Sequence, residues 1–265
     1  MRFLKFWLKS GKFIPFSPIP ENANRAGRLI SRNSKSKRLV KTIFKSLVFL
    51  LTTYISASAG KDPTVVPMAF IRVVDAIAKG SGPLNVFFDG EDMRPKGYQL
   101  GDATGGIGLK PGTHKVKFVR EGVVEGMTTV ILEKDQTVTL IPFAELVPAT
   151  DQKPAHFRVQ ILRLKQKSVD SGRVVTFVSV SARPELKAEL MNDDGTWVGA
   201  FVKRLAIAEV GMKSSQAFVP VKLNGNMTNP IPMGGVGNYV MVLYDDADSK
   251  VQSLYFRDFR YLSAD

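Results

Sequence analysis

Short apolar segments separated by turn residues run from residue 69 to the end of the chain, and this pattern constrains the fold most. Residues 69–76 and 84–88 are rich in β-branched and aromatic side chains, and residues 113–119 alternate between polar and apolar with period two. Glycine, proline and aspartate end such segments roughly every 8–12 residues, which is typical of sandwiches and barrels. The sequence therefore predicts an all-β protein with two β-sandwich domains.

The predicted organisation follows from where this pattern starts, stops and resumes. Pro148 and Pro154 enclose a polar stretch that is typical of an exposed connection between domains. The predicted segments are a basic leader and signal peptide over 1–59, a linker over 60–67, a first β-sandwich over 68–143, an interdomain linker over 144–154, and a second β-sandwich with an insertion over 155–265.

Residues 45–61 have the composition of a secretory signal. A basic flank is followed by an apolar run over residues 47–55 and by the small residues Ala57, Ser58 and Ala59. The alternatives are a retained transmembrane anchor and a buried core helix. The residues between the two flanking lysines span about 22 Å as a helix, whereas the hydrocarbon core of a bilayer is about 30 Å thick. The composition favours a cleaved signal and predicts a mature chain that begins at Gly60.

The first 39 residues are basic and unusually long for the start of a signal. Three interpretations remain open: an extended basic region of the signal, an organelle transit peptide, or sequence that is not translated. The third interpretation is favoured, because a start at Val40 would leave a basic region and an apolar run of ordinary length.

The net charge of +13 suggests a nucleic-acid partner, but its distribution argues against one. Residues 1–59 hold twelve basic residues and one acidic residue, so residues 60–265 carry a net charge of only +2. The chain has no cysteine. Disulfides, a thiol nucleophile, cysteine-ligated metals and a lipoprotein anchor are therefore excluded, and the folded part must depend on its hydrophobic core.

Two similarities between the halves indicate a pair of related units. Residues 157–162 are similar to residues 70–74, and residues 237–244 are similar to residues 112–119. Residues 216–223 predict a strand that contains Pro220, and a proline is expected on the edge of a sheet.

Residues 71–76, the strand over 84–88 that ends in Asp89 and Gly90, and residues 109–116 together resemble a family of bacterial exported domains. The family is the domain of unknown function 4397. The resemblance covers residues 69–142, whereas the second half matches only at residues 237–243. It implies an Ig-like β-sandwich in or outside the cell envelope, and it implies no known activity.

Several candidate ligand sites are incomplete. His114 and His156 are the only two histidines, and both are interpreted as surface strand residues, because a zinc site needs three or four ligands. Residues 104–108 lack the lysine of a phosphate-binding loop, so a bulged or tightly packed strand is favoured. Asp245, Asp246 and Asp248 could bind calcium, although aspartates between two strands are ordinary turn formers.

The densest aromatic stretch lies at residues 254–261. Tyr255, Phe259 and Tyr261 fall on one face of the predicted strand and are candidates for binding a partner. The alternative is that both faces of this strand are packed, one inside the sandwich and one against the neighbouring domain.

These features predict an exported, non-catalytic binding or structural module of the bacterial cell envelope, in the periplasm, at the cell surface or outside the cell. We expect no catalytic residues, no metal and no cofactor. The expected partner is an envelope protein or a glycan, with no nucleic acid and with membrane contact only through an uncleaved signal. The alternative is an exported hydrolase acting on glycan or peptide, with a site assembled from carboxylates such as Asp75, Asp89 and Asp102.

Overall fold

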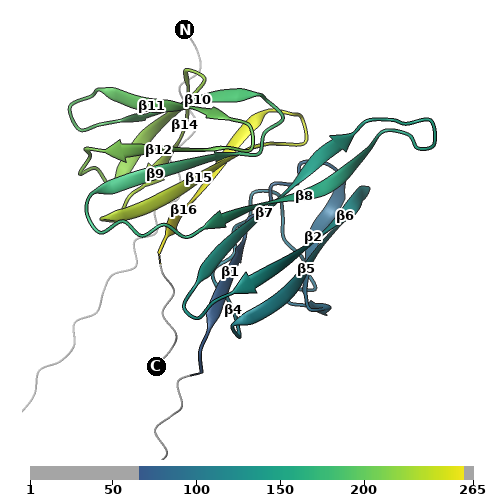
Figure 1. The fold of residues 1–265 in the computed structure, drawn as a ribbon. Coiled ribbons are helices and arrows are strands. Elements are labelled where there is room, and N and C mark those ends of the chain that lie inside the picture. The colour runs from purple at the N-terminus through teal and green to yellow at the C-terminus, as the bar shows by residue number, and fades with distance from the viewer. Residues whose placement is uncertain (1–65, 260–265) are drawn as a thin grey trace, which may run out of the picture. The chain divides into compact units, whose positions relative to one another are not determined.

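The computed structural model describes residues 66–259, which lie in one compact unit of the chain. The predicted signal, the site before Gly60 and Tyr261 lie outside the described residues. Within residues 66–259 all regular structure is β-strand, which confirms the all-β prediction (Figure 1). No helix in this part of the chain is long and apolar enough to cross a membrane.

The first eight strands form one β-sandwich of two facing sheets. The first outer sheet has the strand order β3-β2-β5-β6, and the first inner sheet has the order β8-β7-β1-β4. The two sheets meet at a single pair, Val124 with Arg158. The strands are β1 (Ala69–Val73), β2 (Ser81–Phe88), β3 (Glu91–Asp92), β4 (Ile107–Leu109), β5 (Gly112–Glu121), β6 (Val123–Leu132), β7 (Thr137–Val147) and β8 (His156–Lys165).

The last eight strands form a second β-sandwich, also of two sheets. The second inner sheet has the order β12-β9-β15-β16, and the second outer sheet has the order β11-β10-β13-β14. The strands are β9 (Arg173–Ser179), β10 (Glu185–Met191), β11 (Trp197–Lys203), β12 (Ile207–Met212), β13 (Phe218–Leu223), β14 (Asn226–Pro232), β15 (Gly237–Asp245) and β16 (Val251–Asp258).

The two sandwiches have the same topology, strand for strand. In each, the first strand runs parallel to the seventh: β1 pairs with β7, and β9 pairs with β15. Adding eight to each strand number of the first outer sheet gives the strand order of the second outer sheet. The same holds for the inner sheets when one order is read in reverse. The chain is therefore a tandem repeat, connected by residues 166–172.

This topology changes two of the sequence-based expectations. Residues 144–154 are not an interdomain connection in the structure, because β7 continues to Val147 and pairs along its length with β8. Strand β8 completes the first sandwich, so the second sandwich starts at β9. The similar residues 157–162 and 70–74 lie in β8 and β1. These strands are not equivalent in the repeat, because β1 corresponds to β9.

Three clusters of buried apolar side chains lie between the four sheets and show which sheets pack on each other. One cluster fills the first sandwich, with Ile71 and Phe118 among its fully buried side chains. Another fills the second sandwich, with Phe177 and Leu190. The third lies between the two inner sheets. It joins buried residues of both sandwiches, namely Val74, Ala76, Ile141, Phe143, Leu164, Val178, Val180, Val240, Val242, Tyr244 and Leu254. The two inner sheets therefore pack on each other, and the two outer sheets are the first and last layers.

A close approach at Gly101 connects the sandwiches next to this third cluster. Gly101 has a φ of +87°, and a Cβ atom there would lie 2.6 Å from the hydroxyl of Tyr244 on β15. We expect Gly101→Ala to lower the free energy of unfolding by about 1–3 kcal/mol, because it adds backbone strain and a steric clash.

Two further variants separate the two causes in thermal unfolding. Gly90→Ala places a methyl group in open space at a φ of +93° and reports backbone strain alone. Tyr244→Phe removes the hydroxyl, and in the Gly101→Ala background it should restore part of the lost stability. Equal losses for Gly101→Ala and Gly90→Ala would contradict a clash with Tyr244.

Candidate functional site

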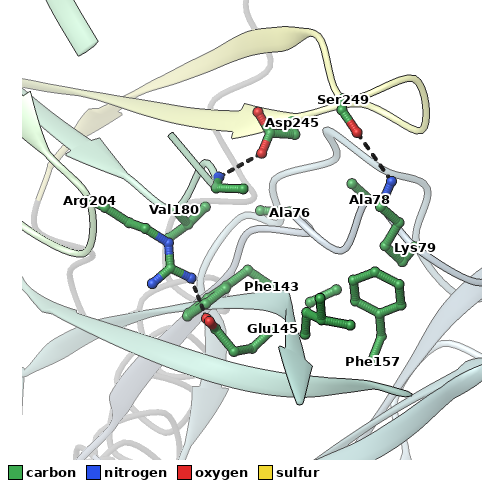
Figure 2. A pocket seen from close by; sticks show the side chains of 13 residues that line it. Ala76, Ala78, Lys79, Phe143, Glu145, Phe157, Val180, Arg204, Asp245 and Ser249 are labelled. Atoms are coloured by element: carbon green, nitrogen blue, oxygen red, sulfur yellow. Dashed lines mark hydrogen bonds and ion pairs between the residues drawn. The ribbon is translucent and has the colours of Figure 1, made fainter. Parts of the chain in front are cut away.

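A cavity of about 380 Å³ lies where residues of both sandwiches meet (Figure 2). Phe143 and Phe157 form part of its wall, and Lys79, Glu145, Arg204 and Asp245 supply charge. The other lining residues are Ala76, Ala78, Ala144, Leu146, Val180, Ala182 and Ser249.

Each charged group of this cavity has an ion-pair or hydrogen-bond partner in the protein. Arg204 forms an ion pair with Glu145, and the Lys79 ammonium donates to the Ser249 hydroxyl at 3.3 Å. The Asp245 carboxylate accepts from Ser181 Oγ and from the Ala182 N–H, both at 2.7 Å. The Arg204–Glu145 and Lys79–Ser249 contacts join the two sandwiches, whereas Asp245 binds groups of the second sandwich alone.

Asp75 is the most strongly perturbed acid among the described residues that the sequence singled out. It follows β1, and its side chain is fully buried. Arg120 Nη1 lies 3.2 Å from its Oδ2, and the Ile77 N–H donates to its Oδ1 at 2.9 Å. Burial raises the pKa of Asp75 to about 6, although the Ile77 N–H and the Arg120 charge act in the opposite direction. The pair ties the end of β1 to β5.

The other two candidate carboxylates of a hydrolase are also bound to the backbone. Asp102 accepts the Gln99 N–H at 2.9 Å, and its own carbonyl accepts the Asp75 N–H. Asp89 lies in the turn after β2, where its carboxylate accepts the Lys115 N–H at 2.8 Å. The structure thus brings Asp75 and Asp102 together and leaves Asp89 at the far end of β2.

His114 belongs to the same turn contact as Asp89. Its Nδ1 lies 2.7 Å from Asp89 Oδ2, and its Nε2 lies 2.7 Å from the Lys110 carbonyl oxygen. Burial lowers the pKa of His114, but the bonds to Lys110 and Asp89 outweigh this and raise it above its usual value. Among the described residues, the His156 ring has one hydrogen-bond partner, the carbonyl oxygen of the nearby Pro154.

The calcium candidate forms the turn between β15 and β16. Asp246 accepts the N–H groups of Asp248 and Lys250, both at 2.9 Å, and these bonds hold the turn closed. Asp245 is occupied by Ser181 and Ala182, as described above. Within residues 66–259, no group of three or more histidine or acidic side chains is arranged to hold a metal ion.

Residues 104–108 form a packed connection into β4. Thr104 Oγ1 accepts the Val73 N–H at 2.9 Å, and β4 pairs antiparallel with β1. A Cβ atom at Gly108 would lie 2.6 Å from the methyl group at the flexible end of Met68.

The aromatic candidates have different environments. Tyr255 lies on β16, an edge strand, opposite Met241 of β15, and its side chain is 39% exposed. Phe259 is 47% exposed, and the guanidinium of the buried Arg72 lies 5.8 Å from its ring. On the opposite face of β16, Leu254 and Phe256 pack in the third apolar cluster.

The prediction that residues 216–223 form an edge strand is wrong. Strand β13 lies between β10 and β14. Its proline is tolerated because the β13–β14 register shifts between Val219 and Val221, which flank Pro220. A bulge of this kind removes the need for a ladder N–H at that position.

The outer faces of the two outer sheets carry exposed features that the sequence analysis did not select. On the first, the Lys117 ammonium lies 5.2 Å from the Phe87 ring centre, and Met127 stands opposite Lys117. On the second, the Lys222 ammonium lies 3.8 Å from the Trp197 ring centre. An open hollow of about 670 Å³ lies beside Phe87, Lys117 and Met127.

These features define a tandem β-sandwich protein with internally bonded acids and two apolar outer faces. The chain matches no protein-family model, and no curated protein is similar to it.

Proposed function

We propose that the protein is an exported, non-catalytic binding or structural module of the bacterial cell envelope, with an envelope protein or a glycan as its partner. The observation that supports this most directly is the use of the candidate acids: Asp75, Asp89 and Asp102 all bind backbone N–H groups. A glycoside hydrolase of the usual kind needs two carboxyl groups on either side of the scissile bond.

Surface composition also supports binding. Large apolar side chains are exposed on sheet faces, where a monomer that bound nothing would favour polar residues. Export rests on the signal-like composition of residues 45–61. Of the residues proposed from sequence, Tyr255 and Phe259 are accessible enough to contact a partner.

A sedimentation assay with isolated cell envelopes from the native host tests this function. We expect residues 60–265 to sediment with the envelopes without releasing soluble sugar or peptide. We expect Tyr255→Ala/Phe259→Ala to bind at least about tenfold more weakly, as for aromatic residues at the centre of an interface. Ile207→Ala is the matched control, because Ile207 is exposed on β12, at the opposite edge of the second inner sheet from β16.

Two results contradict parts of this proposal. Release of sugar or peptide, or no sedimentation at all, would remove the non-catalytic binding function. Equal sedimentation of the double variant and the wild type would show that the C-terminal aromatic residues serve packing alone.

A further inference from the structure

The two sandwiches differ at the side where the outer sheet meets the last strand of the inner sheet. In the first sandwich β6 pairs in parallel with β8 at Val124 and Arg158. A Cβ atom at Gly126 would lie 2.7 Å from the Val159 carbonyl oxygen, so β6 lies directly against β8. In the second sandwich the equivalent strands are β14 and β16, and no pair joins them within residues 66–259. This side is therefore closed in the first sandwich and open in the second.

The lengths of two equivalent hairpins explain the difference. Each hairpin pairs a lysine with an exposed methionine, Lys117 with Met127 in β5–β6 and Lys222 with Met227 in β13–β14. The second hairpin turns at residues 224–225, one pair beyond its lysine. The first hairpin continues past the equivalent pair, and its additional residues are the ones that lie beside β8.

Two leucines align β8 with β16. Leu162 pairs with Ile141, and Leu254 pairs with Val242. All four residues belong to the third apolar cluster, between the inner sheets. Leu162 and Leu254 therefore occupy the same position in the repeat.

Counted from these leucines, Val251 is the equivalent of Val159, and Tyr255 is the equivalent of Arg163. Val159 is 3% exposed beside β6, and Arg163 donates a hydrogen bond to Thr128 on β6. Val251 is only partly buried at the margin of the second core, and Tyr255 is 39% exposed. The positions that β6 covers in the first sandwich thus have no covering strand in the described part of the second.

The backbone of β16 is open at the same side. β16 pairs with β15 along its whole length, from Val251 to Asp258. Every second residue of an antiparallel strand directs its N–H and C=O groups away from that neighbour, so β16 presents such groups at its free edge. An extended polypeptide pairs with groups at this spacing, whereas a glycan chain does not carry matching backbone amides.

We propose that β16 accepts an extended segment of an envelope protein, which lies parallel to β16 as β6 lies parallel to β8. The first sandwich provides the precedent for this occupant, because it fills the equivalent place with a strand of its own. The segment would cover Val251 and contact Tyr255. This inference rests on the proposed binding function and narrows its partner to a protein.

The test fills the open side with the chain's own residues. A copy of residues 119–125 replaces residues 224–225, together with Asn226→Gly, so that β13–β14 becomes as long as β5–β6. This variant should sediment with isolated host envelopes at least about tenfold more weakly than wild-type 60–265, because the added strand occupies the place of the partner. Envelopes treated with a broad-specificity protease and washed should lose wild-type binding by a similar factor.

Controls separate strand pairing from the insertion itself. A glycine-serine loop of the same length at residues 224–225 cannot form the strand and should bind like the wild type. If circular dichroism shows that the extended variant has lost its fold, Ser253→Lys replaces it, since a lysine on an edge strand opposes strand addition. Ile207→Lys places the same charge on β12, at the other edge of this sheet, and should leave binding unchanged.

Two results would overturn the inference. Equal binding by the wild type and by a folded variant that blocks β16 would show that this edge is not the site. Binding that survives protease treatment would assign the partner to glycan and leave the proposed binding function intact. A wild type that does not sediment with untreated envelopes would remove the proposed function and this inference together.

Discussion

Replacement of Arg120 by alanine is expected to lower the free energy of unfolding by about 3–5 kcal/mol at neutral pH, because it leaves a buried carboxylate without its cation. Arg120 Nη1 contacts both Asp75 oxygens and donates to the Ile77 carbonyl at 2.8 Å. Chemical denaturation of the variant and the wild type measures the loss. Arg158→Ala, on the exposed part of β8, is the matched control and should change stability by less than about 0.5 kcal/mol.

The pH dependence identifies Asp75 as the cause. Burial raises the pKa of Asp75 in the folded protein to about 6, from 3.8 for an exposed aspartate. The folded protein therefore binds more protons than the unfolded chain between these values, and wild-type stability should fall as pH rises from about 4 to about 6. At about 1.4 kcal/mol per pKa unit this loss is about 3 kcal/mol.

Two variants check that assignment. Asp75→Asn should remove the Asp75 part of this decrease and leave the part due to Asp258, whose pKa burial also raises. The cost of Arg120→Ala should be smaller at pH 4.5, where Asp75 is protonated, than at pH 8. An equal cost at both pH values would contradict the assigned role of the Asp75 carboxylate.

The second large effect is expected at the polar layer between the inner sheets. Arg72 and Asp258 are both buried, and Arg72 Nη1 lies 3.5 Å from Asp258 Oδ1. Asp258 Oδ2 also accepts the Lys167 N–H at 2.9 Å and the Asn238 amide at 3.3 Å. Asp258→Ala should lower the free energy of unfolding by about 3–5 kcal/mol, because it leaves the buried Arg72 guanidinium without its carboxylate partner.

A double-mutant comparison separates the ion pair from the rest of this layer. Arg72→Met/Asp258→Leu removes both charges and fills their volume, so its loss should be smaller than that of Asp258→Ala alone. The remaining loss should come from the Lys167 N–H, which no longer has this acceptor. If the loss in the double variant equalled the sum of the losses in Arg72→Met and Asp258→Leu made singly, the charges would not interact across the sandwiches.

Local patterns predicted the strands well because each strand depends on residues close in sequence. The period-two segment at residues 113–119 lies within β5, and residues 127–132 and 137–142 lie within β6 and β7. The partners of a strand are not local. Pro148 and Pro154 suggest a connection equally well whether the flanking strands separate or pair, and here they pair as β7 and β8.

The tandem repeat was predicted for the wrong reason. Similar residues at 112–119 and 237–244 lie in β5 and β15, which occupy different positions in the repeat. The equivalent strands share their place in the sheets, and their sequences differ in most residues. The pairing of Asp75 with Arg120 was invisible for a related reason, because 45 residues separate them.

The exposed faces were missed because alternation shows that a strand has two faces without showing which one is buried. The aromatic residues near Tyr255 stand out because they are dense, whereas Phe201 and Phe218 are single residues in different strands. They come to the same side of one sheet only when β11 and β13 take their places on either side of β10.

The buried contact between the inner sheets has a consequence for synthesis of the chain. The first sandwich is complete once Lys165 has been made, but its inner sheet then presents Val74, Ile141 and Phe143 to water. In the complete chain they are covered first by Val178 and Val180 and then by Val240 and Val242 of β15. During that interval the folded first sandwich exposes an apolar sheet face, so the first half expressed alone should aggregate. A chaperone that covers this face would protect the newly made protein.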